Sequence, residues 1–354
     1  MRRVLVVAPN WIGDALMAQP LLALLRKLHP RAEIDALAPP SVAPVLERMP
    51  EVANVISMPF KHGRLQLWQR LQLAGDLREQ GYQAAYVLPN SAKAALVPWL
   101  AGIGLRIGYR GEHRYGLLNV RHAEPARARR GAAGSASGSV PPRPPMARHY
   151  AALAYAPGAT LPENLPSTRL EYDLNETVRI SHRFNLDTRL PVIVLCPGAE
   201  YGPAKRWPPE HFAALSHLLR QSFPYAQIVA VGTQNDAAAA RAIIEQAPFV
   251  RDLCGQTSLT EACALIARAA AVVSNDSGLM HVAAGLNRPL VALYGSTDPR
   301  HTPPLSDTAQ VQWLHLDCSP CFERQCPLGH LNCLRQLTPE QVFETLRAML
   351  HAER

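Results

Sequence analysis

The chain has 354 residues, which is enough for about two domains that each bury their own core. Hydrophobic residues make up 48% and charged residues 18%, a profile typical of soluble globular proteins, and no apolar stretch reaches the roughly 18 residues that span a bilayer. The net charge of +8 favours an anionic partner: nucleic acid, a phosphorylated sugar or an acidic membrane surface.

The first half alternates short apolar runs with helical patterns, which predicts a mainly parallel, doubly wound α/β sheet. We expect strands at residues 4–8, 32–37, 52–58, 84–88 and 106–109, and helices up to residue 28, near 42–48 and near 64–80. The first strand follows two arginines and has no cleavage site typical of a signal peptide, so we expect a cytoplasmic protein.

Asp14 stands in the segment NWIGD, at the turn between the first strand and its helix. A dinucleotide-binding turn carries G-x-G-x-x-G there, whereas this turn has only Gly13 and then a carboxylate that would repel a pyrophosphate. Asp14 is therefore either a helix cap or a catalytic base at the carboxyl edge of the sheet, where open α/β folds bind ligands.

Residues 125–146 contain few large apolar side chains and are rich in Gly, Ser, Ala, Pro and Arg. Such a segment buries too little surface to offset its ordering entropy, which predicts a mobile loop. It is either a plain connection or a basic flap over an anionic substrate.

A second α/β series begins at Pro191, with strands predicted in VIVLC, QIVAVG, AAVVSN and PLVALYG. Helices are expected at residues 209–222, 237–246 and 280–285, and a last one from Thr338 with Pro339 in its first turn. We therefore predict domains at 1–170 and 191–354, joined by a linker at 171–190.

The strongest local motif is NDSGLMHVAAG, where a buried strand turns into a helix. Free N–H groups at the start of that helix would suit a diphosphate. Asp276 either accepts hydrogen bonds from sugar hydroxyls or caps the helix, Ser277 and Gly278 form the turn, and His281 is either a ligand contact or a packed histidine.

Two further loops follow strands of this second series. CPGAEYGPAKRW contains Gly198, which allows close backbone approach, and Lys205, which is either a point charge for phosphate or a solvated side chain. In VGTQND, Gly232 is a further donor-binding candidate, and the residues after it either contact a ribose or base or begin the next helix; they are Thr233, Gln234 and Asp236. We expect all three loops at one edge of the second sheet.

Seven cysteines in a cytoplasmic chain predict reduced thiols or a metal site rather than disulfides. Cys318, Cys321, Cys326 and Cys333, with His330, supply the ligand types that zinc prefers, but the second pair departs from the usual spacing. They are either metal ligands or packed thiols, and nothing indicates metal catalysis.

Taken together, NWIGD, CPGAEYGPAKRWP, NDSGLMHVAA, YGSTDP and CSPCFERQCPLGHLNCL resemble the bacterial heptosyltransferases that build the lipopolysaccharide inner core. The resemblance spans nearly the whole chain in the family's order. It implies a GT-B fold of two facing Rossmann-like domains, the first for the acceptor and the second for the nucleotide sugar.

The resemblance also implies an activity: inverting, metal-independent transfer from ADP-heptose to the first heptose of a phosphorylated Kdo-lipid A acceptor, with no cofactor. By motif, Asp14 becomes the base, Lys205 a contact to the donor diphosphate, and residues 276–278 with His281 the donor loop. Basic residues of the first domain would then meet acceptor phosphates and the inner leaflet, unless they are ordinary surface charge; the candidates are Lys61, Arg64, Arg110 and Arg114.

Three alternatives remain. One is a related transferase with another donor, or one acting on the preceding Kdo acceptor. Another is a nicotinamide or flavin oxidoreductase, disfavoured because G-x-G-x-x-G is absent. The third is a nucleic-acid-binding module, disfavoured because the basic residues are scattered and no recognition motif occurs.

Overall fold

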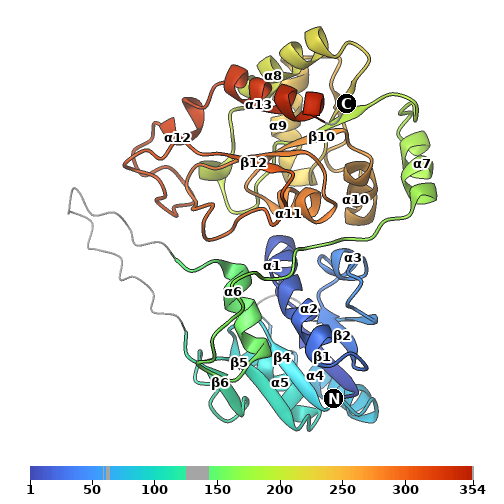
Figure 1. Cartoon of the computed structure of the whole chain (residues 1–354), viewed down its shortest axis with the longest axis vertical. Coiled ribbons are helices and arrows are strands. Elements are labelled where there is room, and N and C mark those ends of the chain that lie inside the picture. Colours follow the sequence, from blue (N-terminus) through green and yellow to red (C-terminus); the bar gives the residue numbers. More distant parts are fainter. Residues whose placement is uncertain (59, 61–63, 125–142, 353–354) are drawn as a thin grey trace. The chain divides into compact units, whose positions relative to one another are not determined.

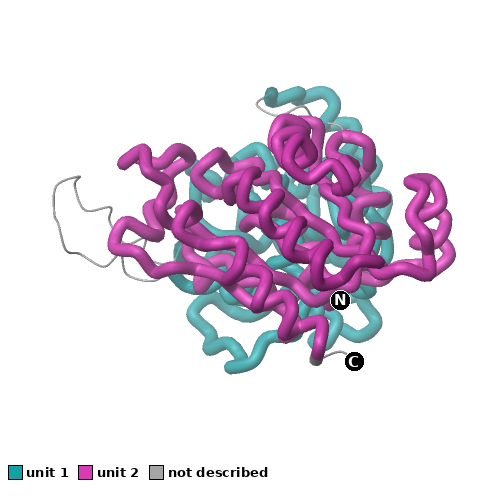
Figure 2. The backbone as a smooth tube through the Cα atoms, turned by 90° about the horizontal axis from the view of Figure 1, so that it is seen from above, with its two compact units in different colours: residues 1–129, 143–168 teal, residues 130–142, 169–354 magenta. Residues whose placement is uncertain are grey.

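The computed structural model describes residues 1–58, 60, 64–124 and 143–352, which form two compact units. Unit 1 contains the described residues up to 168 and unit 2 those from 169 onward (Figure 2). Lys61 lies outside the described residues, as do residues 125–142 of the segment predicted to be a mobile loop; Met146, at the end of that segment, begins a helix.

Unit 1 is built on one six-stranded sheet in the order β3-β2-β1-β4-β5-β6, in which every neighbouring pair is parallel (Figure 1). Its strands are β1 (Arg3–Val7), β2 (Glu33–Ala38), β3 (Asn54–Ser57), β4 (Ala84–Val87), β5 (Leu105–Tyr109) and β6 (Val120–His122). Its helices are α1 (Ile12–Met17), α2 (Gln19–Leu28), α3 (Ala43–Leu46), α4 (Leu67–Glu79), α5 (Ala92–Leu100) and α6 (Met146–Ala151).

Helices cover both faces of this sheet. Successive side chains of a strand point to opposite faces, so each strand contributes to the packing on both. Leu5 and Val7 of β1 pack with Leu73 and Leu77 of α4, whereas α1 and α2 pack with α6. One prediction needs correction: the helix expected to continue to residue 28 is interrupted at Ala18, and α2 begins there with a proline in its first turn.

Unit 2 has a second six-stranded parallel sheet, in the order β12-β11-β10-β7-β8-β9. Its strands are β7 (Val192–Cys196), β8 (Gln227–Ala230), β9 (Arg251–Asp252), β10 (Ala271–Asn275), β11 (Leu290–Leu293) and β12 (Ala309–Gln312). Its helices are α7 (Leu174–Arg183), α8 (Pro209–Ser222), α9 (Ala237–Gln246), α10 (Leu259–Ala267), α11 (Gly278–Gly285), α12 (Asn332–Arg335) and α13 (Pro339–Ala352).

The core of unit 2 lies between the sheet and α8, α9 and α13, where Leu195, Phe212, Ile243 and Leu346 are fully buried. Helix α7 packs against α10, outside this core. Residues 171–190, predicted as a linker, therefore contain a helix that belongs to unit 2.

The two units share one topology. Numbered from the first strand of each unit, both sheets have the order 3-2-1-4-5-6, which reverses direction between the first and fourth strands. Open α/β sheets bind ligands at the carboxyl ends of the strands beside such a switch point. The expected sites are therefore beside β1 and β4 in unit 1, and beside β7 and β10 in unit 2.

Candidate functional site

The site of unit 2 begins where β7 and β10 end side by side. Ser274 pairs with Cys196 in the parallel register, so the loop after β7 and the turn after β10 leave the sheet at adjacent points. The loop carries Lys205 in a short 3₁₀ turn, and the turn carries Asp276 immediately before α11.

Asn275, the last residue of β10, fixes both ends of the Lys205 loop. Its side chain is fully buried, and its Nδ2 donates to the Pro197 carbonyl at 2.7 Å while its Oδ1 accepts from the Trp207 N–H at 3.0 Å. Trp207 is itself buried, and its indole N–H donates to the Leu337 carbonyl at 2.9 Å. Asn275 was not among the predicted site residues, because nothing in the sequence distinguishes it from an ordinary turn asparagine.

Lys205 and Asp276 form the central contact of the site. The Lys205 ammonium lies 2.6 Å from Asp276 Oδ2, and their side chains are 14% and 5% exposed. The hydroxyl of Thr297 donates to the same carboxylate oxygen. The alternative in which Lys205 is a solvated lysine is therefore wrong, and Thr297 is a second residue that the sequence analysis missed.

Asp276 is not the cap of α11. Ser277 occupies the N-cap position, with extended backbone and no side-chain capping bond. The carboxylate of Asp276 instead faces Lys205 and Thr297. The pair carries no net charge, so it is the N–H groups at the start of the eight-residue helix α11 beside it that suit a phosphate group.

His281 lies in α11 and is 5% exposed. Burial lowers the pKa of its imidazole to about 4; Asp276 acts against this shift, and Lys205 adds to it. The imidazole is therefore neutral at pH 7, so it can offer a hydrogen bond to a ligand but no positive charge.

Gly198, Gly232 and Thr233 gather around another carboxylate, that of Asp236. A Cβ on Gly198 would stand 2.3 Å from Asp236 Cγ, and one on Gly232 would stand 3.0 Å from Asp236 Oδ2. The N–H and hydroxyl of Thr233 donate to Asp236 Oδ2 at 2.9 and 2.8 Å, and the first of these bonds belongs to a capping box at the 3₁₀ turn Gln234–Asp236. Of the two roles predicted for Thr233, the structure shows the one that begins a helix.

In unit 1, Asp14 lies at the switch point, half-buried in the first turn of α1. Trp11 occupies the N-cap position, so the alternative in which Asp14 caps the helix is wrong. Asp14 stands close to Tyr150 of α6: burial chiefly raises the pKa of that phenol, and the charge of Asp14 adds to the effect. The carboxylate thus sits at the ligand edge of its sheet.

Arg114 does not belong to an acceptor-facing surface. It is 2% exposed, and its guanidinium donates to the carbonyls of Tyr109 and Pro89 and to the side chain of Asn90. Its role is to hold loops together, which corrects the prediction that it meets acceptor phosphates. Arg64 and Arg110 are exposed.

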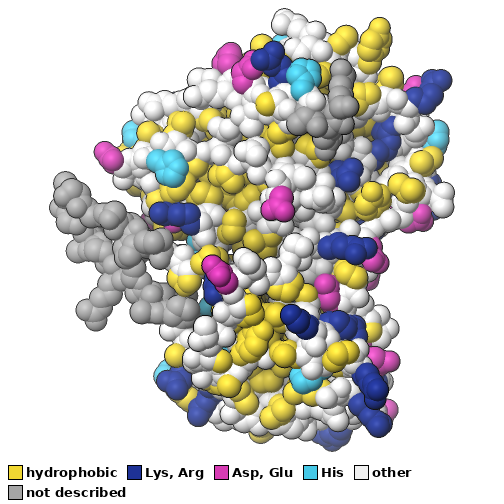
Figure 3. All heavy atoms as spheres, in the orientation of Figure 1, with side chains coloured by type: hydrophobic (Ala, Val, Ile, Leu, Met, Phe, Trp, Pro, Cys, Tyr) yellow, Lys and Arg dark blue, Asp and Glu magenta, His cyan; other side chains and the backbone are white. Residues whose placement is uncertain are grey.

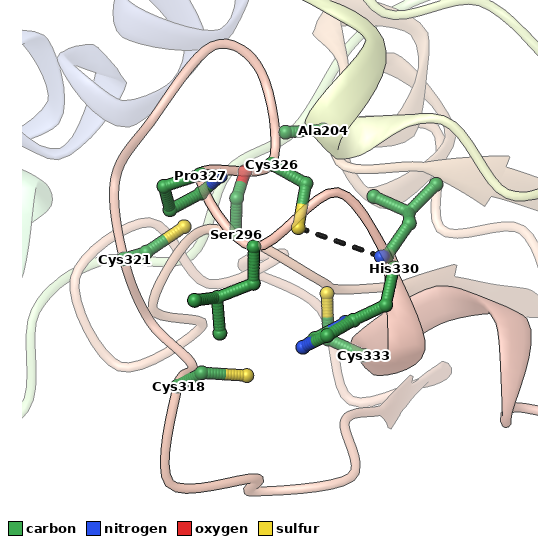
Figure 4. Close-up of a pocket in the computed structure, with 10 residues that line it drawn as sticks. Ala204, Ser296, Cys318, Cys321, Cys326, Pro327, His330 and Cys333 are labelled. Atoms are coloured by element: carbon green, nitrogen blue, oxygen red, sulfur yellow. Dashed lines mark hydrogen bonds between the residues drawn. The ribbon is translucent and has the colours of Figure 1, made fainter.

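The cysteine-rich segment forms a pocket in unit 2 beside the Lys205 loop, since Ala204 and Ser296 also line it (Figure 4). Cys318, Cys321, Cys326 and Cys333 line it together with His330, and all four are free thiols. Burial acts to raise the pKa of the Cys326 thiol, but backbone N–H groups of residues 328–331 outweigh it and lower that pKa. Within the part of the chain that the structure describes, no group of three or more His, Cys, Asp or Glu side chains is arranged to hold a metal ion.

Comparison with known proteins shows extensive similarity. A model of glycosyltransferase family 9 (heptosyltransferase) matches residues 70–332. The chain is 42% identical to lipopolysaccharide heptosyltransferase 2 of Escherichia coli strain K12 over 99% of both chains. It is 38% identical to lipooligosaccharide heptosyltransferase 2 of Haemophilus influenzae, over 98% of this chain and 99% of the relative.

A solved structure, that of E. coli ADP-heptose LPS heptosyltransferase II, matches with a TM-score of 0.85 and 41% identity over 100% of this chain and 99% of that one. The two parallel-sheet units and this neighbour confirm the predicted GT-B fold class. Among the described residues, no helix combines the length and apolarity needed to cross a membrane.

Proposed function

Because the chain belongs to glycosyltransferase family 9, the heptosyltransferases, we propose that it transfers L-glycero-D-manno-heptose from ADP-heptose to the first heptose of a phosphorylated Kdo-lipid A acceptor. The observation that carries this proposal is the similarity to heptosyltransferase 2 of E. coli over nearly all of both chains. A transferase acting on the preceding Kdo acceptor and a nucleotide-binding oxidoreductase are not favoured.

In the proposed reaction, an acceptor hydroxyl attacks the anomeric carbon of the donor from the face opposite ADP. A carbon–oxygen bond forms to the acceptor, the bond to the diphosphate breaks, and ADP leaves with the electron pair. Asp14 takes the hydroxyl proton, a form of general base catalysis worth about 10²–10⁴ in rate. Its place at the carboxyl edge of the first sheet supports this role.

Charge that develops on the leaving diphosphate meets Lys205 and the first N–H groups of α11. Asp276 and Thr297 hold the ammonium in place before the donor arrives, since the lysine is already in contact with the carboxylate. His281, being neutral, completes the donor loop as a hydrogen-bonding group. The backbone near Gly198, Gly232 and Thr233 would border the same donor site.

The acceptor carries a lipid anchor, so we place the reaction at the cytoplasmic face of the inner membrane, with the protein bound peripherally. The net charge of +8 and the exposed Arg64 and Arg110 support contact with acceptor phosphates and an anionic leaflet.

Mass spectrometry of the acceptor tests the proposal. A heptose-bearing Kdo-lipid A is incubated with ADP-heptose and either the native protein or Asp14→Asn, with circular dichroism to verify that the variant folds. Addition of one heptose by the native protein and its loss in the variant are the expected results. No addition by the native protein would reject the donor and acceptor, and full activity of the variant would reject Asp14 as base.

A further inference from the structure

Four large apolar side chains are exposed together at the start of α4 in unit 1. They are Leu65, Leu67, Trp68 and Leu71, with exposed fractions of 49, 46, 84 and 39%, and we call them the Trp68 patch. The side of α4 that faces the core is a different one, formed by residues 70, 73, 74 and 77. The Trp68 patch is therefore a second apolar surface, separate from the core stripe.

The backbone under the patch is bonded to Arg70. This side chain is 5% exposed; its Nε donates to the Leu65 carbonyl at 2.6 Å and one terminal nitrogen donates to the Lys93 carbonyl at 2.8 Å. Its guanidinium also lies 4.0 Å from the centre of the Phe60 ring. These contacts tie the segment before α4 to the start of α5, beneath the exposed apolar side chains.

The patch lies at the same sheet edge as Asp14. All strands of unit 1 are parallel, and both α1, which follows β1, and α4, which follows β3, begin at the carboxyl ends of those strands. The first turn of α4 and the first turn of α1 therefore share the edge that the proposed function assigns to the acceptor.

Two exposed basic side chains flank the patch. Arg64 precedes it, and Lys93 is exposed at the neighbouring start of α5. Two acids lie near the beginning of α5: the Glu112 carboxylate accepts from the Ala92 N–H at 3.0 Å, and the Glu124 carboxylate accepts from Asn90 Nδ2 at 2.6 Å. The acids of α4 itself, Asp76 and Glu79, follow Trp68 by at least eight residues, or about 12 Å along a helix axis.

We propose that the Trp68 patch docks on an anionic lipid bilayer and so brings the Asp14 edge to an acceptor held in that bilayer. This inference rests on the proposed function, because the acceptor is a lipid. Tryptophan favours the membrane interface, where its ring is apolar and its N–H stays hydrated, and flanking arginine and lysine are attracted to anionic headgroups. The area that four side chains can bury falls well short of the roughly 800 Å² per partner of a stable protein interface. Shallow insertion into a bilayer needs only a few apolar side chains.

Vesicle binding tests the docking surface without any need for activity. The full chain is sedimented with vesicles of phosphatidylethanolamine and phosphatidylglycerol, and the Trp68→Ser, Leu71→Ser double variant is compared with Tyr225→Ser, which removes an aromatic side chain 77% exposed in unit 2. We expect at least about a tenfold loss of vesicle affinity for the double variant and none for Tyr225→Ser. Equal binding by the native protein and the double variant would overturn the proposal.

Activity on two forms of the acceptor separates this inference from the function on which it rests. The double variant should transfer heptose to a deacylated acceptor in solution at the native rate, and about tenfold more slowly to the acceptor in vesicles. Transfer to neither form by the native protein would reject the proposed function, whereas the vesicle-binding result would stand. An equal loss of transfer activity on both acceptor forms would place the patch in the sugar site. If the native protein were a dimer and the double variant a monomer with unchanged vesicle binding, the patch would instead contact a second copy of the chain. Either result overturns the proposal.

Discussion

Replacing Lys205 with methionine tests the ion pair at the centre of the unit 2 site. The change leaves the carboxylate of Asp276, whose side chain is 5% exposed, without its cation. Breaking a buried pair on one side costs about 3–5 kcal/mol. Because Thr297 still donates to the same oxygen and Lys205 is 14% exposed, we expect the lower end, about 3 kcal/mol, in the free energy of unfolding by urea.

A second substitution separates stability from catalysis. Asp276→Asn in the Lys205→Met background removes the unpaired charge and should restore most of the lost stability. Activity should stay low, because the lysine proposed to stabilise the leaving diphosphate is still absent; the expected loss in kcat/KM for ADP-heptose is about 10²–10³. If the double variant regained activity together with stability, Lys205 would serve only to neutralise Asp276, and the reasoning would be refuted. Lys27→Met, at an exposed position, is the control and should change stability by less than about 0.5 kcal/mol.

Further predictions concern the supports of the site. Asn275→Ala removes two buried hydrogen bonds and should lower the free energy of unfolding by about 2–4 kcal/mol in urea titrations. Gly198→Ala places a Cβ against Asp236 and should lower the free energy of unfolding by about 1–3 kcal/mol. Gly75→Ala, in open space within α4, should raise it by about 0.5–1 kcal/mol. Equal effects of the two changes would contradict the close approach of Gly198 to Asp236. The folded-state pKa of His281, about 4, lies below its unfolded value of 6.5, so the free energy of unfolding should fall by about 3 kcal/mol as pH drops from 6.5 to 4. His281→Gln should remove this dependence of stability on pH. An unchanged dependence would show that another group titrates.

Central strands and long helices could be predicted from the sequence because their signals are local. The buried run VIVLC and the amphipathic helices at residues 209–222 and 237–246 appear in the structure at the predicted positions. The strands that were missed are β6, β9 and β12, and each is at a sheet edge: β6 and β9 contain two polar residues each, and β12 is half polar. An edge strand does not need the continuous apolar run that identifies a central one.

Some missed features did have a signal. Helix α10 begins at a capping box formed by Ser258 and Glu261, a spacing visible in the sequence. The burial of Arg114 had no signal in the sequence, because an arginine buried against backbone carbonyls has the same sequence pattern as an exposed one. The same holds for Asn275 and Thr297: their importance depends on contacts with residues far along the chain, which only the folded topology brings together.

The two units use one topology for opposite chemistry. At the switch point of unit 1, the turn after the first strand carries the carboxylate of Asp14, which can accept a proton and repels a diphosphate. At the equivalent point of unit 2, the loop after β7 carries the ammonium of Lys205, for which we propose contact with the leaving diphosphate. The sheet order is the same in both units, so the fold does not distinguish the two sites. The side chains at the turn after the first strand of each unit distinguish them. Replacing either Asp14 or Lys205 should therefore slow the whole transfer reaction, since bond formation to the acceptor and departure of ADP belong to one displacement, while both sheets stay intact.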